Sequence, residues 1–186
     1  WEKERSKTRP KNMANYLTIG RVLMIPVFLV LMYVDFPGSR YWALGVYIVA
    51  CLTDFADGYI ARHYNQISDF GKFMDPLADK CLVMAALCCF VEQGDMLAWI
   101  LAVVLVRAFA VSDMRLIAVE KGRVIAAAWS GKIITASTMV CICMILFGIP
   151  HGLNIVCQVV ILVTTVYSGV EYFMKNADVF KSGELT

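Results

Sequence analysis

Long apolar segments separated by short polar ones are the feature that most constrains how this chain folds. They occupy about 14–34, 41–53, 71–91, 96–118 and 127–148, and a sixth runs on to about 174. A helix of about 20 apolar residues is needed to cross the hydrocarbon core of a bilayer. The second run meets charged residues before it reaches that length. We therefore predict an all-α polytopic membrane protein with six transmembrane helices.

The composition supports this fold class and excludes several others. Of the 186 residues, 60% are hydrophobic and only 17% are charged, and the formal net charge is +2. A soluble domain is about half apolar and about a quarter charged. The chain is thus not predicted to be a secreted disulfide scaffold, a disordered regulator or a nucleic-acid binder. We expect a polar tail over 1–11 and one membrane domain over 12–186.

The termini and the cysteines add little about function. The first eleven residues are too charged for a signal peptide, which needs an apolar core of its own. Because the chain begins with Trp1 rather than Met, we expect its native start to be missing or replaced. The seven cysteines lie in apolar stretches without C-x-x-C spacing, so we predict that they act as small hydrophobic residues.

Lys and Arg are distributed unequally between the two sides that six spans would create. One side carries both tails and the second and fourth connections, with these bases: Lys3, Arg5, Lys7, Arg9, Lys11, Arg62, Lys72, Lys121, Arg123, Lys175 and Lys181. The opposite connections carry Arg40 alone, together with Asp35, Glu92 and Asp95. Cytoplasmic connections are enriched in Lys and Arg. We therefore predict a multi-pass protein of the cytoplasmic (inner) membrane with both termini in the cytoplasm.

Charged residues also lie inside the first four predicted spans, in their cytoplasmic halves, whereas none occurs from Ile133 to Val170. A charged side chain in hydrocarbon costs at least about 2.5 kcal/mol, so such groups face a wet, protein-lined cavity. The sequence thus indicates a functional site that opens to the cytoplasm.

Four aspartates form the most informative cluster. Asp54 and Asp57 are three residues apart, and Asp75 and Asp79 are four apart. Each pair therefore lies on one face of its helix. Two antiparallel helices joined by a short cytoplasmic connection would bring the pairs together, where the carboxylates repel unless cations hold them. An all-oxygen ligand set suits two Mg²⁺ or Mn²⁺ ions, which together can clamp a phosphoryl group.

The residues around these aspartates fit a phosphate-containing substrate. Gly58, Ala61 and Gly71 are small and lie beside the acids in helical register, where they leave room for a ligand. Arg62 carries a planar guanidinium that suits phosphate oxygens. The alternative for any single aspartate is a helix cap or a solvated charge, but that alternative does not explain the whole pattern.

The stretch 54–79 has the form D-x2-D-G-x2-A-R-x8-G-x3-D-x3-D. It resembles the motif of the CDP-alcohol phosphotransferase family at every fixed position. The resemblance implies a six-helix membrane fold, a homodimer and a reaction in which a hydroxyl attacks the β-phosphorus of a CDP-linked lipid and CMP leaves. It implies metal ligands at Asp54, Asp57 and Asp75, and a general base at Asp79 that can also touch a metal. The residues implied to surround the cytidine diphosphate are Gly58, Ala61, Arg62, Ser68 and Gly71.

Two other segments resemble bacterial phosphatidylglycerophosphate synthases. In the first, Asn15, Thr18 and Arg21 share one helical face and are expected to contact the CDP-lipid. The second runs from Arg107 to Lys132, and the ending 171–180 adds weak support. With these segments, the resemblance covers nearly the whole chain from residue 12. It implies CDP-diacylglycerol and glycerol 3-phosphate as substrates and phosphatidylglycerophosphate and CMP as products.

Four bases are candidates for binding the phosphate of the acceptor. Arg107 and Arg115 lie two helical turns apart, and Arg123 and Lys132 flank the next cytoplasmic connection. Such a cluster suits glycerol 3-phosphate, which carries a dianionic phosphate and a primary hydroxyl. The alternative role for these bases is ordinary anchoring at the cytoplasmic surface, which Arg107 fits least because it lies deep in an apolar run.

The chain departs from the pattern of these synthases at three positions near the bases. Ala108 stands where Glu is usual, Asp113 where a small residue is usual, and Ile134 where a second base is usual. Asp113 precedes Arg115 by two residues and would offset part of the positive field. These differences concern the acceptor pocket and leave the aspartates untouched.

Other functions fit parts of the sequence. A transferase of the same family with another acceptor, such as phosphatidylglycerol, serine or an inositol phosphate, would share the aspartates. A divalent-cation or proton-coupled transporter would also bury carboxylates, but transporters place them near the bilayer midplane and often show inverted repeats. A non-catalytic membrane assembly protein would not need the metal-binding pattern.

Overall fold

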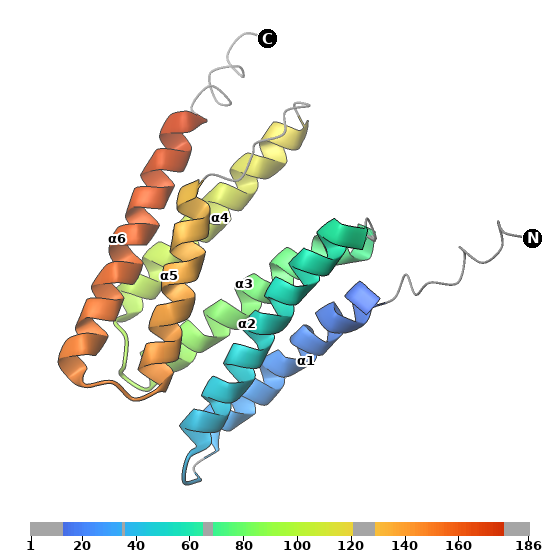
Figure 1. Ribbon diagram of the computed structural model, residues 1–186. Coiled ribbons are helices and arrows are strands. Elements are labelled where there is room, and N and C mark those ends of the chain that lie inside the picture. Colours follow the sequence, from blue (N-terminus) through green and yellow to red (C-terminus); the bar gives the residue numbers. More distant parts are fainter. Residues whose placement is uncertain (1–12, 35, 65–68, 121–128, 177–186) are drawn as a thin grey trace, which may run out of the picture. The chain divides into compact units, whose positions relative to one another are not determined.

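The computed structural model covers residues 1–186 and describes the backbone of residues 13–34, 36–64, 69–120 and 129–176. Within those ranges, the side chains of 13–18, 54–64, 69–76, 79 and 119–120 lie outside the description. All regular structure in the described ranges is helical. Six helices are present there: α1 (Met13–Tyr33), α2 (Ser39–Tyr64), α3 (Asp69–Glu92), α4 (Ala98–Glu120), α5 (Trp129–Leu146) and α6 (His151–Lys175) (Figure 1).

These helices confirm the all-α prediction, and their bounds lie close to the apolar segments except in α2, which continues past the second segment to Tyr64. Glycines with a positive φ stand at the connections, where a side chain would strain the backbone. Gly94 has a φ of 79° after α3, and Gly148 has a φ of 82° after α5. Pro150 then precedes α6 with an extended backbone (φ −61°, ψ 151°). Glycine and proline thus stand between successive helices.

The chain divides into two compact units, Trp1–Cys89 and Phe90–Thr186. In the first unit, α1 packs against α2 (Figure 1). Phe28 and Tyr47 are both fully buried, and their ring centroids lie 6.0 Å apart at an interplanar angle of 52°. Ala43 and Ala50, one turn to either side of Tyr47, are also fully buried. Small residues on α2 therefore leave room for the two aromatic rings between the helices.

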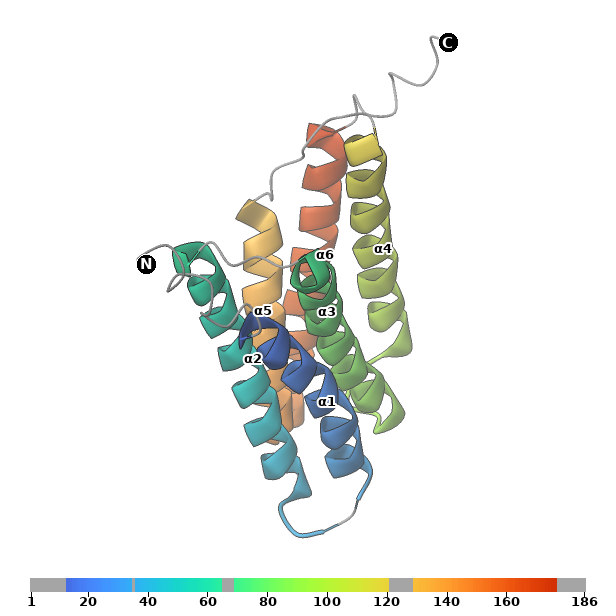
Figure 2. The ribbon, with the colours of Figure 1, turned by 90° about the vertical axis from the view of Figure 1, so that its right-hand side faces the viewer.

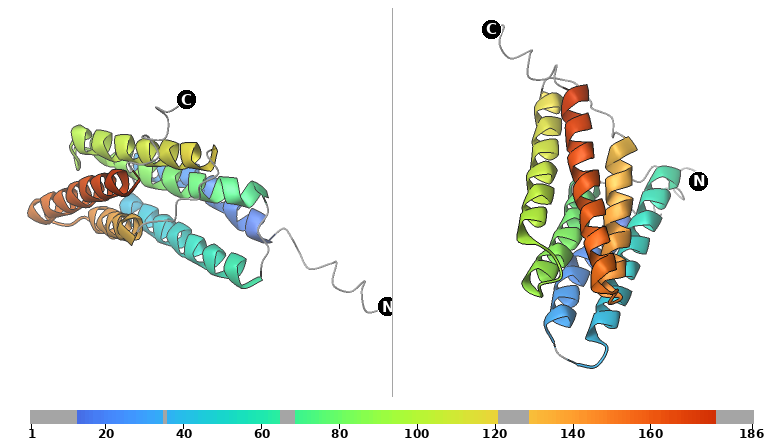
Figure 3. Two further views of the ribbon diagram at one scale, coloured as in Figure 1. Left: turned by 90° about the horizontal axis from the view of Figure 1, so that it is seen from above. Right: turned by 90° about the vertical axis from the view of Figure 1, so that its left-hand side faces the viewer.

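In the second unit, α6 lies between α4 and α5 and packs against both (Figures 2 and 3). Six of the buried residues of α6 recur at alternating intervals of four and three, namely Asn154, Gln158, Ile161, Thr165, Ser168 and Tyr172, and Cys157 and Gly169 are buried beside them. In α4, Val104, Val111, Met114 and Ala118 are buried at compatible spacing. Such spacing keeps one side of a helix facing its neighbours. Several of the buried positions of α6 are polar, although the span as a whole is apolar.

Two of these polar residues hold the connection before α4. The backbone carbonyl of Asp95 accepts hydrogen bonds from Asn154 Nδ2 at 2.8 Å and from Gln158 Nε2 at 3.0 Å. The backbone N–H of Leu97 donates to Gln158 Oε1 at 3.2 Å. A buried polar group is costly unless it is hydrogen-bonded. The amides of α6 therefore fix the start of α4 by replacing water at its backbone groups.

The apolar helices fit a membrane protein. Among the described residues, α5 and α6 are long and apolar enough to cross a membrane, and α1 contains a shorter apolar stretch, Ile19–Tyr33. Large apolar side chains are exposed on several helices, for example Val30, Trp42, Val106, Val140 and Val163. Extensive exposed apolar surface marks a contact with lipid or another apolar partner.

Candidate active site

The four aspartates lie on the two helices for which they were predicted. Asp54 and Asp57 belong to α2, and Asp75 and Asp79 belong to α3. Both segments are helical, so residues three apart (the first pair) and four apart (the second pair) each share one helical face. The side chains of all four lie outside the described part of the structure.

The aspartates stand at matching distances from the facing ends of α2 and α3 in the sequence. Asp54 lies ten residues before Tyr64, the last residue of α2, and Asp79 lies ten residues after Asp69, the first of α3. Because each helical residue adds about 1.5 Å, these two aspartates stand equally far from the connection. Asp57 and Asp75 are closer to it by similar amounts. The donor set at this level is all carboxylate, which fits Mg²⁺ or Mn²⁺.

The residues predicted to contact the CDP-lipid are distributed over the same unit. Gly58, Ala61 and Arg62 lie in the last turns of α2 and Gly71 in the first turn of α3, all without described side chains. Ser68 lies outside the described residues. Asn15 and Thr18 lie in the first two turns of α1, again without described side chains, and Arg21 follows one turn later. Arg21 is 1% exposed, so it is buried among protein groups.

Arg107 is held against α6 in the second unit. Its Nη2 donates a hydrogen bond of 2.5 Å to Ser168 Oγ, and Ser168 is 1% exposed. Its Cγ lies 3.4 Å from the place that a Cβ at Gly169 would occupy, which is van der Waals distance, so the arginine stem packs against this glycine. Its Nε is buried and has no hydrogen-bond partner within the described part of the chain. Of the five N–H donors of Arg107, the described contacts therefore use one, on Nη2.

Arg115 contacts the same helix one turn farther along. Its Nε donates to Tyr172 Oη at 3.3 Å, and its guanidinium carbon lies 5.8 Å from the centroid of the Tyr172 ring. Tyr172 is 2% exposed and packs with Val111 and Met114 of α4. Arg115 as a residue is exposed. The structure thus brings Arg107 and Arg115 to neighbouring turns of α6.

The other two bases are placed differently. Lys132 is exposed in the first turn of α5, where its ammonium lies 5.0 Å from the centroid of the Trp129 ring. This is a cation–π contact, and Trp129 itself is 78% exposed. Arg123 lies outside the described residues. Among the contacts of the described residues, none joins Lys132 to the arginines of α4, so its assignment to the acceptor remains a prediction.

The three departures from the synthase pattern lie around these bases. Asp113 is exposed, and within the described part of the chain it forms no ion pair with Arg115. Residues two apart point to nearly opposite sides of a helix, which explains this. Ala108 is half-buried, and Ile134 is buried on α5. Asp113 therefore makes no direct contact that would neutralise Arg115.

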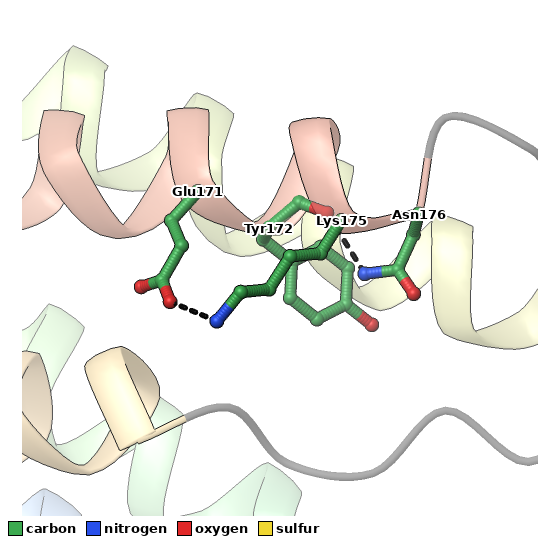
Figure 4. Close-up of polar contacts among 4 residues, drawn as sticks. All are labelled: Glu171, Tyr172, Lys175 and Asn176. Carbon is green, nitrogen blue, oxygen red and sulfur yellow. Dashed lines mark hydrogen bonds and ion pairs between the residues drawn. The ribbon is translucent and has the colours of Figure 1, made fainter.

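Sequence reasoning missed Ser168, Gly169 and Tyr172, which form the α6 side of the arginine contacts. A signal was present, since Thr165, Ser168 and Tyr172 recur at helical spacing within an otherwise apolar span. Nearby, Glu171 forms an ion pair with Lys175, and Asn176 Nδ2 donates to the backbone carbonyl of Tyr172 at 2.8 Å (Figure 4). Glu171 therefore forms its ion pair with a base of the same helix.

Known proteins resemble this chain over most of its length. It is 35% identical over 190 residues to the CDP-diacylglycerol–glycerol-3-phosphate 3-phosphatidyltransferase of Bacillus subtilis, with 92% of this chain and 98% of the relative covered. It is 35% identical over 172 residues to a probable phosphatidylglycerophosphate synthase of Mycobacterium tuberculosis, with 89% and 82% covered. A Rickettsia bellii protein with the same name as the Bacillus relative is 40% identical over 105 residues, with 56% and 58% covered.

The match to a family extends across both compact units. A sequence model of CDP-alcohol phosphatidyltransferases matches residues 11–170, a range that contains the four aspartates and both arginines of α4. The resemblance noted in the sequence is thereby confirmed. This chain belongs to the CDP-alcohol phosphatidyltransferase family.

Proposed function

We propose that this enzyme transfers the phosphatidyl group from CDP-diacylglycerol to glycerol 3-phosphate, giving phosphatidylglycerophosphate and CMP. The observation that carries the proposal is the similarity, over nearly full length, to a Bacillus protein named for that reaction. The arginines of α4 support it, because glycerol 3-phosphate is an anionic acceptor and an uncharged alcohol would not need them. Guanidinium groups are well suited to phosphate oxygens.

The proposed setting is the cytoplasmic membrane, crossed by six helices with both termini in the cytoplasm. The apolar α5 and α6 and the exposed apolar side chains support a membrane location. The unequal distribution of Lys and Arg supports the orientation. In that orientation the aspartates of α2 and α3 belong to the cytoplasmic halves of their helices. A homodimer is expected from the family resemblance.

The aspartates have two proposed roles. Asp54, Asp57, Asp75 and Asp79 would hold two Mg²⁺ or Mn²⁺ ions, which when bound neutralise negative charge on the diphosphate and on the leaving CMP. Asp79 is the proposed general base, and its carboxylate accepts the proton of the primary hydroxyl of glycerol 3-phosphate. The hydroxyl oxygen then bonds to the phosphatidyl phosphorus as the bond from that phosphorus to CMP breaks.

The remaining residues are proposed to bind the two substrates. Small side chains at Gly58, Ala61 and Gly71 let the cytidine diphosphate approach the helices, and Arg62 donates to its oxygens. The other proposed CDP-lipid contacts are Asn15, Thr18, Arg21 and Ser68. Arg107 and Arg115 bind the acceptor phosphate, with Arg123 and Lys132 as further proposed contacts. Arg107 and Arg115 are already ordered by α6, which reduces the entropy lost when the acceptor binds.

An acceptor assay tests the proposed reaction. Purified protein in detergent or nanodiscs receives CDP-diacylglycerol, Mg²⁺ and one radiolabelled acceptor at a time: glycerol 3-phosphate, serine, an inositol phosphate or phosphatidylglycerol. We expect lipid-soluble label and matching CMP release with glycerol 3-phosphate. Product formed only with another acceptor would support the alternative transferase. If the protein is reconstituted into sealed vesicles, movement of Mg²⁺ across the membrane without any lipid product would instead support the transporter hypothesis.

Replacing Arg107 by alanine tests the acceptor site. We expect Arg107→Ala to raise the KM for glycerol 3-phosphate by about tenfold to a hundredfold, the usual effect of losing a charged hydrogen bond. The KM for CDP-diacylglycerol should change less than twofold. Lys175→Ala is a matched control, since it removes an exposed base that pairs with Glu171. Equal changes in both KM values would show that Arg107 has a structural role.

A further inference from the structure

The buried hydroxyls on α6 have a use beyond packing. Ser168 is 1% exposed and Tyr172 is 2% exposed, and each accepts a hydrogen bond from an arginine of α4. Thr165, one turn earlier, is also fully buried, but its Oγ1 donates to the Ile161 carbonyl of its own helix at 2.6 Å. Ser168 and Tyr172 therefore differ from Thr165 in what they contact.

The position of Arg107 shows why it needs such a contact. It lies in α4 between Val104 and Val111, which are both 6% exposed, on the side of the helix that packs against α6. A guanidinium at such a position must be hydrogen-bonded to offset its desolvation. The arginine stem packs against Gly169, and the neighbouring Ser168 accepts one N–H. Ser168 thus contacts the guanidinium of Arg107, and Gly169 contacts its aliphatic stem.

The contacts leave the arginines able to bind an anion. A guanidinium has five N–H donors. In the described contacts, Ser168 accepts one hydrogen bond from Arg107, and Tyr172 accepts one from Arg115. Hydroxyl groups orient an arginine without cancelling its charge, whereas a carboxylate would do both. Glu171, the acid beside Tyr172, is paired with Lys175 (Figure 4). The α6 surface therefore orders two cations and keeps both charges available.

We propose that Ser168 and Tyr172 are positioning residues, which hold Arg107 and Arg115 in the conformations that bind the phosphate of the acceptor. The inference rests on the proposed function, which assigns both arginines to glycerol 3-phosphate. Ser168 and Tyr172 thereby favour acceptors with a phosphate dianion over uncharged alcohols, although neither residue touches the substrate. Their effect is expected in the KM for the acceptor rather than in kcat.

Two substitutions remove the hydroxyls with little change in volume. Ser168→Ala deletes the acceptor for Arg107, and Tyr172→Phe deletes the acceptor for Arg115 but keeps the ring that packs with Val111 and Met114. Ser168→Thr retains a hydroxyl at the same position. Thr165→Val is the matched control for a buried hydroxyl of α6 that contacts no arginine. Tyr167→Phe is the control for an exposed tyrosine of α6.

We expect Ser168→Ala and Tyr172→Phe each to raise the KM for glycerol 3-phosphate about five- to tenfold. The KM for CDP-diacylglycerol, kcat and the melting temperature should stay near the values of the controls, and Ser168→Thr should restore most of the acceptor affinity. If Ser168→Ala does not fold, the acceptor KM of Tyr172→Phe by itself tests the positioning role.

The failure of this inference is distinguishable from the failure of the proposed function. If the wild-type protein makes no product from glycerol 3-phosphate, the proposed function is wrong, and the inference fails with it. If the wild-type protein is active but the hydroxyl-deletion variants keep the wild-type acceptor KM, only the positioning role is wrong. Equal changes in both KM values, or a Ser168→Thr variant as impaired as Ser168→Ala, would also contradict that role.

Discussion

Asp79→Asn is expected to lower kcat by about a thousandfold at saturating Mg²⁺ while CDP-diacylglycerol still binds. The carboxamide has nearly the same shape as the carboxylate, but it cannot accept the proton of the attacking hydroxyl. The step most affected is therefore proton removal rather than substrate binding. Turnover measured as CMP release, together with equilibrium binding of a labelled CDP-lipid, separates the two effects.

Asp113→Asn is the matched control for this substitution. It makes the same chemical change on an exposed residue of α4 that forms no ion pair with Arg115 within the described residues. We expect its kcat to remain within twofold of the wild-type value. Metal-dependent turnover that survives Asp79→Asn would remove Asp79 from the role of general base. Loss of CDP-lipid binding along with turnover would point to a binding role instead.

Removal of divalent cations is expected to abolish turnover. Four carboxylates that meet in one site, as proposed for the aspartates of α2 and α3, would repel one another unless positive charge offsets them. Treatment with EDTA should therefore reduce CMP release to background, and added Mg²⁺ or Mn²⁺ should restore it. The melting temperature should fall on chelation as well, since cations that bind only the folded site stabilise it.

Substitutions of single aspartates identify the carboxylates on which the metal requirement depends. Asp54→Asn, Asp57→Asn and Asp75→Asn should each shift the Mg²⁺ concentration for half-maximal turnover upward by at least about tenfold. Asp113→Asn should leave that concentration unchanged. Full turnover in EDTA, or a Mg²⁺ requirement that no aspartate variant alters, would contradict the proposed metal site.

The helices could be predicted from the sequence because their limits are set locally. Apolar length defines each span, and residues such as Gly38, Gly94 and Gly148 end or separate them. The first helix is predicted to run from about residue 14 to about residue 34, and in the structure it runs from Met13 to Tyr33. The aspartate pairs could be predicted for the same reason, since spacing within one helix fixes which residues share a face.

The pairing of helices could not be predicted in this way. The buried polar residues of α6 (Asn154, Gln158, Thr165 and Ser168) recur at helical spacing and mark one side of that helix, but they do not show which helix that side meets. The contact of Arg107 with Ser168 joins residues 61 positions apart, and so does the contact of Leu97 with Gln158. Such contacts depend on tertiary packing, and only the structure revealed that hydroxyls on α6 receive the arginines of α4.

The central claim is that the acceptor is glycerol 3-phosphate, and its most direct test compares this acceptor with glycerol. The wild-type protein is assayed at saturating CDP-diacylglycerol and Mg²⁺, and kcat/KM is measured for both compounds. Because they differ only in the phosphate that the arginines are proposed to bind, we expect glycerol 3-phosphate to be favoured at least about a thousandfold. Equal values for the two acceptors, or a preference for glycerol, would contradict the account.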